Sequence, residues 1–291
     1  MNHKAGFVNI IGKPNVGKST LMNALIGQKL SVVNPKAQTT RHRIKGIING
    51  EDYQIVFSDT PGIMKPAYKL HEKMLDAVQA TFADADVMIY VAEIGEKDIE
   101  EDLKEKFTHL NIPLFLVLNK MDKVDQYGLE NAIEHWKTVF KWTEIIPVSA
   151  LHKFNTGFII DKILNYLPES EAYFEKDILT DRNERFFVTE IIREKILTLY
   201  QKEIPYSTEV VIDYFKDEPT ISKIGATIFV TRESQKAILL GHQGAAIKRL
   251  GTHARKRMEE FLGRRVYLDL TIKVNDNWRD DDNALKRFGY E

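Results

Sequence analysis

The sequence has no cysteine among its 291 residues, which excludes a disulfide scaffold and any metal site built on thiolates. It has no apolar run of about 18 residues, so we expect no segment inserted in a membrane. The N-terminus lacks the apolar region of a signal peptide, and together these absences favour a soluble, cytoplasmic protein. The net charge of −1 indicates no partner by itself, so any surface for nucleic acid must be local.

The composition is that of a globular chain, 43% hydrophobic and 29% charged, and the length is sufficient for two domains with separate cores. Pro168 is expected to end a helix, and the stretch that follows it is acidic and irregular. The aromatic residues of this stretch, Tyr173 and Phe174, either pack on one domain or lie exposed. We predict a first domain, a linker and a second domain, which span 1–168, 169–182 and 183–291.

In the first half of the chain, short apolar runs alternate with helical patterns. Strands are expected near 6–11, 44–49, 53–58, 86–92, 113–118 and 144–148. Helices are expected near 18–27, 68–83, 98–109, 129–141 and 155–166. This alternation predicts an α/β fold, a mostly parallel sheet with helices on both faces. In such sheets ligands bind beyond the carboxyl ends of the strands, and the motifs below fall at those ends.

The first strand pattern is followed by a sequence of the form G-x-x-x-x-G-K-[ST] and then by a helical pattern. Two glycines let successive backbone N–H groups point at one phosphate, and the start of the helix adds its positive dipole end. Lys18 is expected to reach the β- and γ-phosphates of a nucleotide, and Ser19 to bind Mg²⁺. The expected phosphate-binding residues are Gly12, Lys13, Pro14, Asn15, Val16, Gly17, Lys18, Ser19 and Thr20.

Two further segments are suited to sense the γ-phosphate. In a polar loop, a threonine can place its hydroxyl on Mg²⁺ and its N–H on the γ-phosphate, and we favour Thr40 over Thr39 for this role. After the third strand, Asp59 suits the water shell of Mg²⁺, and Gly62 can bring its N–H to the γ-phosphate. Alone, the second segment would be equally good as a simple turn. The expected switch residues are Gln38, Thr39, Thr40, Asp59, Thr60, Pro61 and Gly62.

The motif Asn-Lys-Met-Asp after the fifth strand pattern selects the base. The carboxylate of Asp122 can accept hydrogen bonds from N1–H and the 2-amino group of guanine, whereas adenine offers no donors there. The stem of Lys120 would cover the ring, and Asn119 would hold the loop. A small residue after the last strand lets a backbone N–H approach guanine O6. The expected guanine-binding residues are Asn119, Lys120, Asp122, Ser149, Ala150 and Leu151.

These motifs, in this order and at these spacings, resemble the translation-factor-related class of P-loop GTPases over roughly residues 5–168. The resemblance implies hydrolysis of GTP with Mg²⁺. Ile63 stands where many such enzymes have a glutamine that orients the attacking water, so we expect slow intrinsic hydrolysis. The resemblance also implies a K⁺ ion beside the phosphates, with Asn15 as its ligand. The alternatives are that Asn15 only shapes the loop and that an external activator supplies catalysis.

The second half follows a different pattern, α-β-β-α-α-β, with elements near 184–200, 208–215, 226–231, 235–240, 245–262 and 265–274. The two short helices flank a Gly-His-Gln-Gly loop, which would let a nucleic-acid backbone approach closely. From 241 to 265 there are seven Lys or Arg residues and two acidic ones, against 20 and 18 from 180 to 291. Basic charge is therefore concentrated here, as phosphate binding requires. The expected RNA-binding residues are Gly241, His242, Gln243, Gly244, Lys248, Arg249, Arg255 and Lys256.

Loop, charge and element order together resemble a KH domain of the prokaryotic topology, a domain that grips about four nucleotides of single-stranded nucleic acid. RNA is favoured over DNA by the pairing with a GTPase. Such loops often have a lysine or arginine between the glycines, where this sequence has His242 and Gln243. We therefore expect weaker phosphate binding, or binding that strengthens at low pH, because a histidine side chain can take up a proton there.

A P-loop GTPase followed by one KH domain resembles the Era-like family, bacterial GTPases of small-ribosomal-subunit assembly. The resemblance implies GTP-dependent binding near the 3′ end of 16S ribosomal RNA on the 30S subunit, and peripheral membrane association in some members. We expect a monomer that acts as a timer: GTP orders the segments of Thr40 and Gly62, RNA is held, and hydrolysis releases it. The alternatives are an RNA chaperone or scaffold whose hydrolysis is incidental, and a GTPase directed at tRNA or at general stress.

Overall fold

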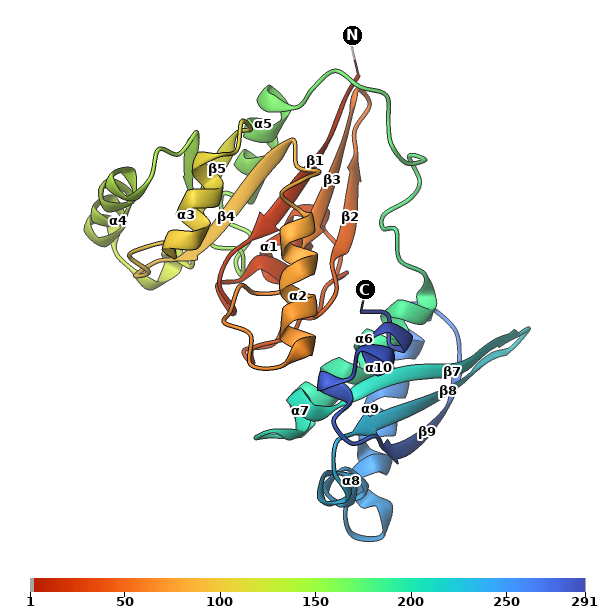
Figure 1. The fold of residues 1–291 in the computed structure, drawn as a ribbon. Helices are drawn as coiled ribbons and strands as arrows, with labels where there is room; N and C mark the ends of the chain where they lie inside the picture. Colours follow the sequence, from red (N-terminus) through yellow and green to blue (C-terminus); the bar gives the residue numbers. More distant parts are fainter. Residues whose placement is uncertain (1–2, 291) are drawn as a thin grey trace. The chain divides into compact units, whose positions relative to one another are not determined.

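The computed structural model describes residues 3–290, and the chain divides into two compact units (Figure 1). The first unit comprises the residues up to Ser31, Thr40–Lys65 and Met74–Asp181. The second comprises Val32–Thr39, Pro66–Lys73 and the residues from Arg182 onward. Met1, Asn2 and Glu291, the outermost residues of the two predicted domains, lie outside the described residues.

The first unit is built on a six-stranded sheet of order β2-β3-β1-β4-β5-β6. Its strands are β1 (Lys4–Ile11), β2 (Ile44–Asn49), β3 (Tyr53–Asp59), β4 (Val87–Glu93), β5 (Leu114–Asn119) and β6 (Glu144–Pro147). All neighbouring strands pair in parallel except β2 and β3, which are antiparallel because a short turn joins them directly. The mostly parallel sheet predicted from the sequence is confirmed.

Helices cover this sheet. They are α1 (Lys18–Ile26), α2 (Lys69–Ala80), α3 (Glu101–Thr108), α4 (Gln126–Val139) and α5 (Thr156–Tyr166), with a 3₁₀ turn at Met121–Lys123. Tyr90 of β4 packs with Phe107 of α3 and Trp136 of α4 in one hydrophobic cluster. The alternate residues of β4, Ile89 and Val91, are also fully buried. Because successive side chains of a strand point to opposite faces, both faces of the sheet are covered. A ligand is therefore expected at the ends of the strands.

A strap, residues 169–181, runs along the outer side of the first unit (Figure 1). The side-chain oxygen of Gln54 accepts hydrogen bonds from the backbone N–H groups of Tyr173 (2.7 Å) and Phe174 (3.0 Å). The ring of Tyr173 lies 4.8 Å from the ring of Phe7. Of the two arrangements that the sequence left open for these aromatic residues, the structure shows contact with the first unit, with Tyr173 still 48% exposed.

The second unit contains a three-stranded sheet of order β7-β8-β9, in which β7 and β8 are antiparallel and β8 and β9 are parallel. Its helices pack on this sheet around buried residues such as Ile192, Ile224 and Leu250. The elements are α6 (Glu184–Leu199), α7 (Ile204–Ser207), β7 (Glu209–Glu218), β8 (Ile221–Val230), α8 (Glu233–Leu240), a 3₁₀ turn (His242–Gly244), α9 (Ala245–Leu262), β9 (Val266–Val274), a 3₁₀ turn (Trp278–Asp280) and α10 (Asp282–Arg287). The predicted α-β-β-α-α-β order is confirmed.

The sequence interpretation missed the short helices α7 and α10, ended β7 too early and began β8 too late, near 226 instead of Ile221. The two helices have four and six residues, which is too short for a helical period to show. The last three residues of β7, Lys216–Glu218, are charged and exposed, so they carry no apolar alternation, whereas the start of β8 is buried or half-buried. The C-terminal tail is nevertheless well anchored: the indole of Trp278 is buried and donates to the backbone oxygen of Ser207 (3.1 Å). In the described part of the chain, no helix is both long and apolar enough to cross a bilayer.

Candidate nucleotide-binding site and nucleic-acid interface

The loop between β1 and α1 has the backbone geometry of a phosphate cradle. Gly12 and Gly17 have φ values of +150° and +102°, in a region that residues with a side chain rarely adopt. A Cβ atom at Gly12 would lie 2.4 Å from the backbone oxygen of Val91. The ammonium of Lys18 donates to the backbone oxygens of Gly12 (3.0 Å) and Lys13 (2.9 Å), so it lies across the loop. Burial lowers the pKa of Lys18 to about 8, against the attraction of Asp59 and Glu96.

Three oxygen-bearing side chains converge beside this loop. The hydroxyl of Ser19 donates to Oδ2 of Asp59 (2.7 Å) and lies 2.9 Å from the hydroxyl of Thr40, which is 3.3 Å from the same Oδ2. Oδ1 of Asp59 is buried and has no hydrogen-bond partner among the described residues. Burial raises the pKa of Asp59, and hydrogen bonding by Ser19 opposes the rise. A compact set of hydroxyl and carboxylate oxygens suits a hard cation such as Mg²⁺.

Not all predicted switch residues join this set. The hydroxyl of Thr39 donates to the backbone oxygen of Lys36 (2.7 Å), and Gln38 and Thr39 both lie in the segment that groups with the second unit. Thr40, the next residue, faces Ser19 and Asp59. The two neighbouring threonines therefore have different environments, and only the hydroxyl of Thr40 reaches the oxygen cluster.

The segment after β3 lies directly against the phosphate loop. The backbone N–H of Ile63 donates to the oxygen of Gly12 (3.1 Å), and the hydroxyl of Thr60 donates to the oxygen of Ile10 (2.8 Å). A Cβ atom at Gly62 would lie 2.8 Å from the backbone of Pro14, so glycine is required for this approach. The side chain of Ile63 packs against the hydrophobic cluster of α3 and α4. Ile63 is thus both chemically and geometrically unable to orient a water molecule.

Asn119, at the end of β5, joins three of the predicted loops. Its side-chain N–H₂ donates to the backbone oxygen of Val16 (2.8 Å), and its side-chain oxygen accepts from the backbone N–H groups of Lys120 (2.8 Å) and Ala150 (3.0 Å). Oδ1 of Asp122 accepts a hydrogen bond from the hydroxyl of Ser149 (2.5 Å), which lowers the pKa of Asp122. The residues predicted to bind guanine therefore lie together. Within this group Asn119, Ser149 and Ala150 are buried, whereas Asp122 and Leu151 are exposed.

Glu93, the last residue of β4, was not predicted as part of the site. Its two carboxylate oxygens lie 2.5 Å from the ammonium of Lys120 and 2.7 Å from that of Lys123. The Lys120 ammonium also donates to the backbone oxygen of Asn15 (2.8 Å). A usable signal was present, because Glu93 ends a buried parallel strand, as Asp59 and Asn119 do.

In the second unit, the Gly-His-Gln-Gly loop joins α8 to α9. Gly241, Gln243 and Gly244 have φ values of +70°, +49° and +76°, and a Cβ at Gly241 would lie 2.6 Å from Cβ of Ala246. The side chain of His242 is exposed at the tip. The α9 helix begins directly after the loop, so its first N–H groups are available to an anion.

The surface around this loop combines apolar and basic side chains. Ile238 on α8 is 50% exposed and Leu240 is 37% exposed. The predicted basic residues of α9 are all exposed: Lys248, Arg249, Arg255 and Lys256. An exposed glycine loop, a helix start, apolar side chains and basic residues together form the candidate nucleic-acid interface.

Comparison with known proteins supports both units. A family model described as a 50S ribosome-binding GTPase matches residues 7–120, and a KH-domain model matches residues 203–279. The GTPase Era of Syntrophus aciditrophicus is 43% identical over 291 residues, covering 99% of this chain and 95% of the relative. The GTPase Era of Clostridium kluyveri is 41% identical over 295 residues, covering 99% of each chain.

Solved structures of Era match over nearly the entire chain. A crystal structure of Era in complex with MgGDPNP and nucleotides 1506–1542 of 16S ribosomal RNA has a TM-score of 0.93, 39% identity and coverage of 99% of both chains. A crystal structure of a single-residue variant of Aquifex aeolicus Era, bound to GDP·AlF₄⁻, has the same TM-score and coverage, with 38% identity. A phosphate loop, a guanine site and a KH domain in one chain, matched end to end, show that this protein belongs to the GTPase Era family and is a GTPase.

Proposed function

We propose that this protein is a nucleotide-dependent switch that binds 16S ribosomal RNA through its KH domain and acts in biogenesis of the 30S subunit. The observation that carries the proposal is the full-length match to an Era structure that holds both a GTP analogue and 16S nucleotides. The family model that matches the first unit carries the description "50S ribosome-binding GTPase", which names the other ribosomal subunit. It matches only residues 7–120, so we give more weight to the relative that matches both units.

The proposed Mg²⁺ ligands are the hydroxyls of Ser19 and Thr40, with Asp59 binding through a water molecule. The support is their convergence within 3.3 Å and the buried, unpaired Oδ1 of Asp59 in the described structure. The relative was crystallised with MgGDPNP. When bound, the ion would neutralise charge on the β- and γ-phosphates. The remaining phosphate contacts are assigned to the loop from Gly12 to Thr20, with Lys18 as its cation.

In the proposed hydrolysis, the oxygen of water forms a bond to the γ-phosphorus while the bond to the bridging oxygen of GDP breaks. Lys18 and the backbone N–H groups of the loop stabilise the charge on the transferred phosphoryl group. The apolar side chain of Ile63 cannot orient the water, which supports a slow intrinsic rate of GTP hydrolysis. We keep K⁺ with Asn15 as its ligand as the proposed source of further charge stabilisation, and an external activator as the alternative.

The proposed guanine contacts are Asn119, Lys120, Asp122 and the Ser149–Leu151 loop. Support comes from Asn119, whose three hydrogen bonds hold the phosphate loop and both guanine loops in one arrangement. Asp122 stays ionised because its pKa is lowered, so it can accept from both guanine donors.

For RNA, we propose binding of the 3′ region by the Gly241–Gly244 loop together with Lys248, Arg249, Arg255 and Lys256. The geometry of the loop and the exposure of the basic residues support this interface. We further propose that the protein works as a cytoplasmic monomer with at most peripheral membrane contact. Sedimentation of the purified chain alone tests whether it is a monomer, and sedimentation with lipid vesicles tests for membrane contact.

The decisive experiment compares the affinity of the full chain for a 3′-terminal 16S fragment in the presence of GDP and of a non-hydrolysable GTP analogue. A switch predicts different affinities, because only the γ-phosphate orders the segments of Thr40 and Gly62. Identical affinities would favour the alternative, an RNA chaperone or scaffold in which hydrolysis is incidental. Crosslinking in cells followed by sequencing of the bound RNA then separates 16S RNA from tRNA.

A further inference from the structure

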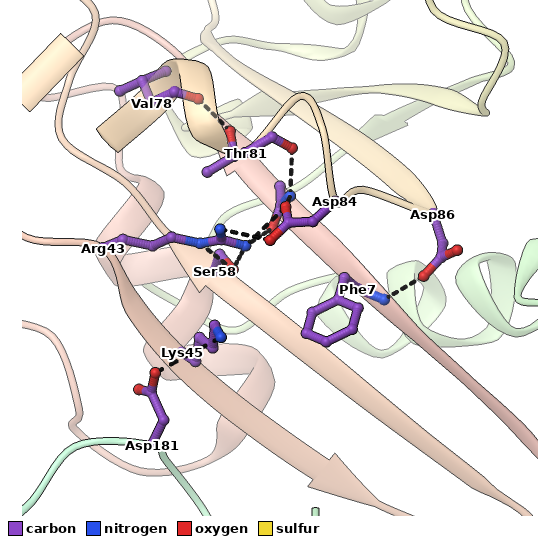
Figure 2. A network of polar contacts seen from close by, with 10 residues as sticks. Phe7, Arg43, Lys45, Ser58, Val78, Thr81, Asp84, Asp86 and Asp181 are labelled. Atoms are coloured by element: carbon purple, nitrogen blue, oxygen red, sulfur yellow. Dashed lines mark hydrogen bonds and ion pairs between the residues drawn. The ribbon is translucent and has the colours of Figure 1, made fainter. Parts of the chain in front are cut away.

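Arg43 connects the end of one switch segment to the rest of the sheet. It follows Thr40 by three residues and directly precedes β2. Its guanidinium binds both carboxylate oxygens of Asp84, with Nη1 2.7 Å from Oδ2 and Nη2 3.0 Å from Oδ1 (Figure 2). This two-pronged contact fixes the plane of the guanidinium as well as its position.

The same guanidinium reaches two buried side chains of the sheet. Nε donates to the hydroxyl of Ser58 (3.0 Å), and Nη2 donates to the side-chain oxygen of Asn9 (3.0 Å). Asn9 of β1 and Ser58 of β3 are fully buried and lie opposite each other in the parallel ladder. Buried polar groups of this kind are costly to leave unpaired, so the position of Arg43 is strongly determined.

The network also includes the end of α2. The side-chain N–H₂ of Asn9 donates to the backbone oxygen of Thr81 (2.6 Å) and to Oδ1 of Asp84 (2.8 Å). Thr81 follows α2 directly, and Ser58 directly precedes Asp59. Arg43 and Asn9 therefore join three places: the exit of the Thr40 segment, the strand that carries Asp59, and the end of the helix after Gly62.

We propose that Arg43 is a positioning residue of the GTPase, which acts through Thr40. The inference rests on the proposed roles of Thr40 and Mg²⁺. By fixing the chain three residues after Thr40, the network keeps the Thr40 hydroxyl close to Ser19 and Asp59. GDP has no γ-phosphate for the Thr40 segment to contact, whereas GTP has one. The network therefore favours binding of GTP over GDP.

The choice of arginine is part of the inference. Five polar contacts join Arg43 to Asp84, Asn9 and Ser58, and these need the planar fork of a guanidinium. A lysine at this position keeps the charge but cannot bind both oxygens of Asp84 together with Asn9 and Ser58. Arg43→Lys therefore removes the network without removing the positive charge.

The test measures the affinities of the full chain for GDP and for a non-hydrolysable GTP analogue, both with Mg²⁺. In Arg43→Lys we expect about tenfold weaker binding of the analogue, the typical value of a hydrogen bond to a charged group, with GDP changed less than about twofold. Asp84→Asn should act in the same direction, and it serves if Arg43→Lys does not fold. The matched control is Arg264→Lys, since Arg264 binds Glu184 and Asp217 in the second unit and should affect neither nucleotide.

A second measurement separates positioning from general stability. In a Thr40→Ala background, Arg43→Lys should change the affinity for the analogue less than about twofold, because residues that act through one another are not additive. Equal losses for GDP and the analogue, or full additivity with Thr40→Ala, would overturn the inference and assign Arg43 to stability alone. If the unmutated chain binds guanine nucleotides no better than other nucleotides, the proposed function is contradicted instead. Failure of the inference about Arg43 and failure of the proposed function can therefore be told apart.

Discussion

The ammonium of Lys120 lies 2.5 Å from a carboxylate oxygen of Glu93 and 2.8 Å from the backbone oxygen of Asn15. This lysine is thereby fixed at its charged end between the guanine loop and the phosphate loop. A fixed ammonium leaves only the methylene stem free to lie over the base, as proposed for guanine binding. Glu93 thus orients Lys120, which is proposed to cover the base, without having to contact nucleotide itself.

We expect Glu93→Gln to weaken binding of GDP and of GTP to a similar, modest extent, about two- to tenfold. The effect is small because the pair is partly exposed and screened by solvent. The measurement is the dissociation rate of a fluorescent guanine nucleotide. Glu134→Gln, which removes the surface ion pair with Lys137, is the control and should leave the rate unchanged. An unchanged rate in Glu93→Gln would show that Lys120 needs no such partner.

Asp122→Asn should shift base preference from guanine to xanthine. The carboxylate is proposed to accept two hydrogen bonds from guanine, whereas an amide can donate to the oxygen that xanthine has in place of the 2-amino group. We expect GTP affinity to fall about 10- to 150-fold, the range for hydrogen bonds to a charged group. Competition between GTP and xanthosine triphosphate gives the preference directly. A variant that still prefers GTP would contradict the assignment of Asp122 to the base.

The hydrogen bond from Ser149 should extend guanine binding to lower pH. This bond lowers the pKa of Asp122 from its ordinary value of 3.8, so the carboxylate stays ionised to a more acidic pH than it would alone. The stabilisation of the Asp122 carboxylate by this hydrogen bond is complete above pH 3.8. It is lost as the pH falls through the lowered pKa of Asp122. In Ser149→Ala, GDP affinity should therefore decline at a higher pH than in the unmutated chain. Circular dichroism at each pH checks that both proteins remain folded.

His242→Lys should strengthen RNA binding and make it more sensitive to salt. A permanent positive charge at the exposed tip of the glycine loop adds one phosphate contact. The slope of log K against log salt should then become steeper by roughly 0.7, the value for one contact with a single strand. His109→Lys, an exposed histidine of the first unit, is the control for added charge. An unchanged slope would place the tip of the loop outside the RNA contact.

Replacing Na⁺ by K⁺ should accelerate GTP hydrolysis if Asn15 helps to hold a monovalent cation. The ion would spread positive charge over the transition state, in place of the glutamine that Ile63 does not supply. The measurement is the rate of phosphate release at constant ionic strength in the two salts. Equal rates would leave Asn15 with a role in loop shape only. In Asn15→Ala, the ratio of the rates in K⁺ and Na⁺ should fall to about one.

Sequence reasoning identifies candidate site residues most readily where they are consecutive in the chain. The phosphate loop and the Asn119–Asp122 loop consist of consecutive residues, because each requires a particular backbone path next to a strand end. It failed where side chains from distant positions meet. Glu93 stands 27 residues before Lys120, and Arg43 meets Asn9 and Asp84 from separate parts of the chain, so no spacing in the sequence reveals either contact.

The C-terminal tail shows a second limit. Tyr290 and Trp278 are buried, and the hydroxyl of Tyr290 donates to Glu209 (2.7 Å), 81 residues earlier in the chain. Because the tail has only one short helix of six residues, its sequence carries no periodic pattern. Its order comes from burial of aromatic side chains against the second unit, which only the folded structure shows.

The strap has a consequence for solubility. A sheet edge with unpaired N–H and C=O groups is a template for strands of other molecules, and β2 is such an edge. Here the N–H of Ile47 donates to the oxygen of Leu179 (2.8 Å), and the oxygen of Lys45 accepts from the hydroxyl of Thr180 (2.7 Å). The other edge, β6, has only four residues and ends in Pro147, which cannot donate. Both edges of the sheet are therefore poor templates for strands of another molecule.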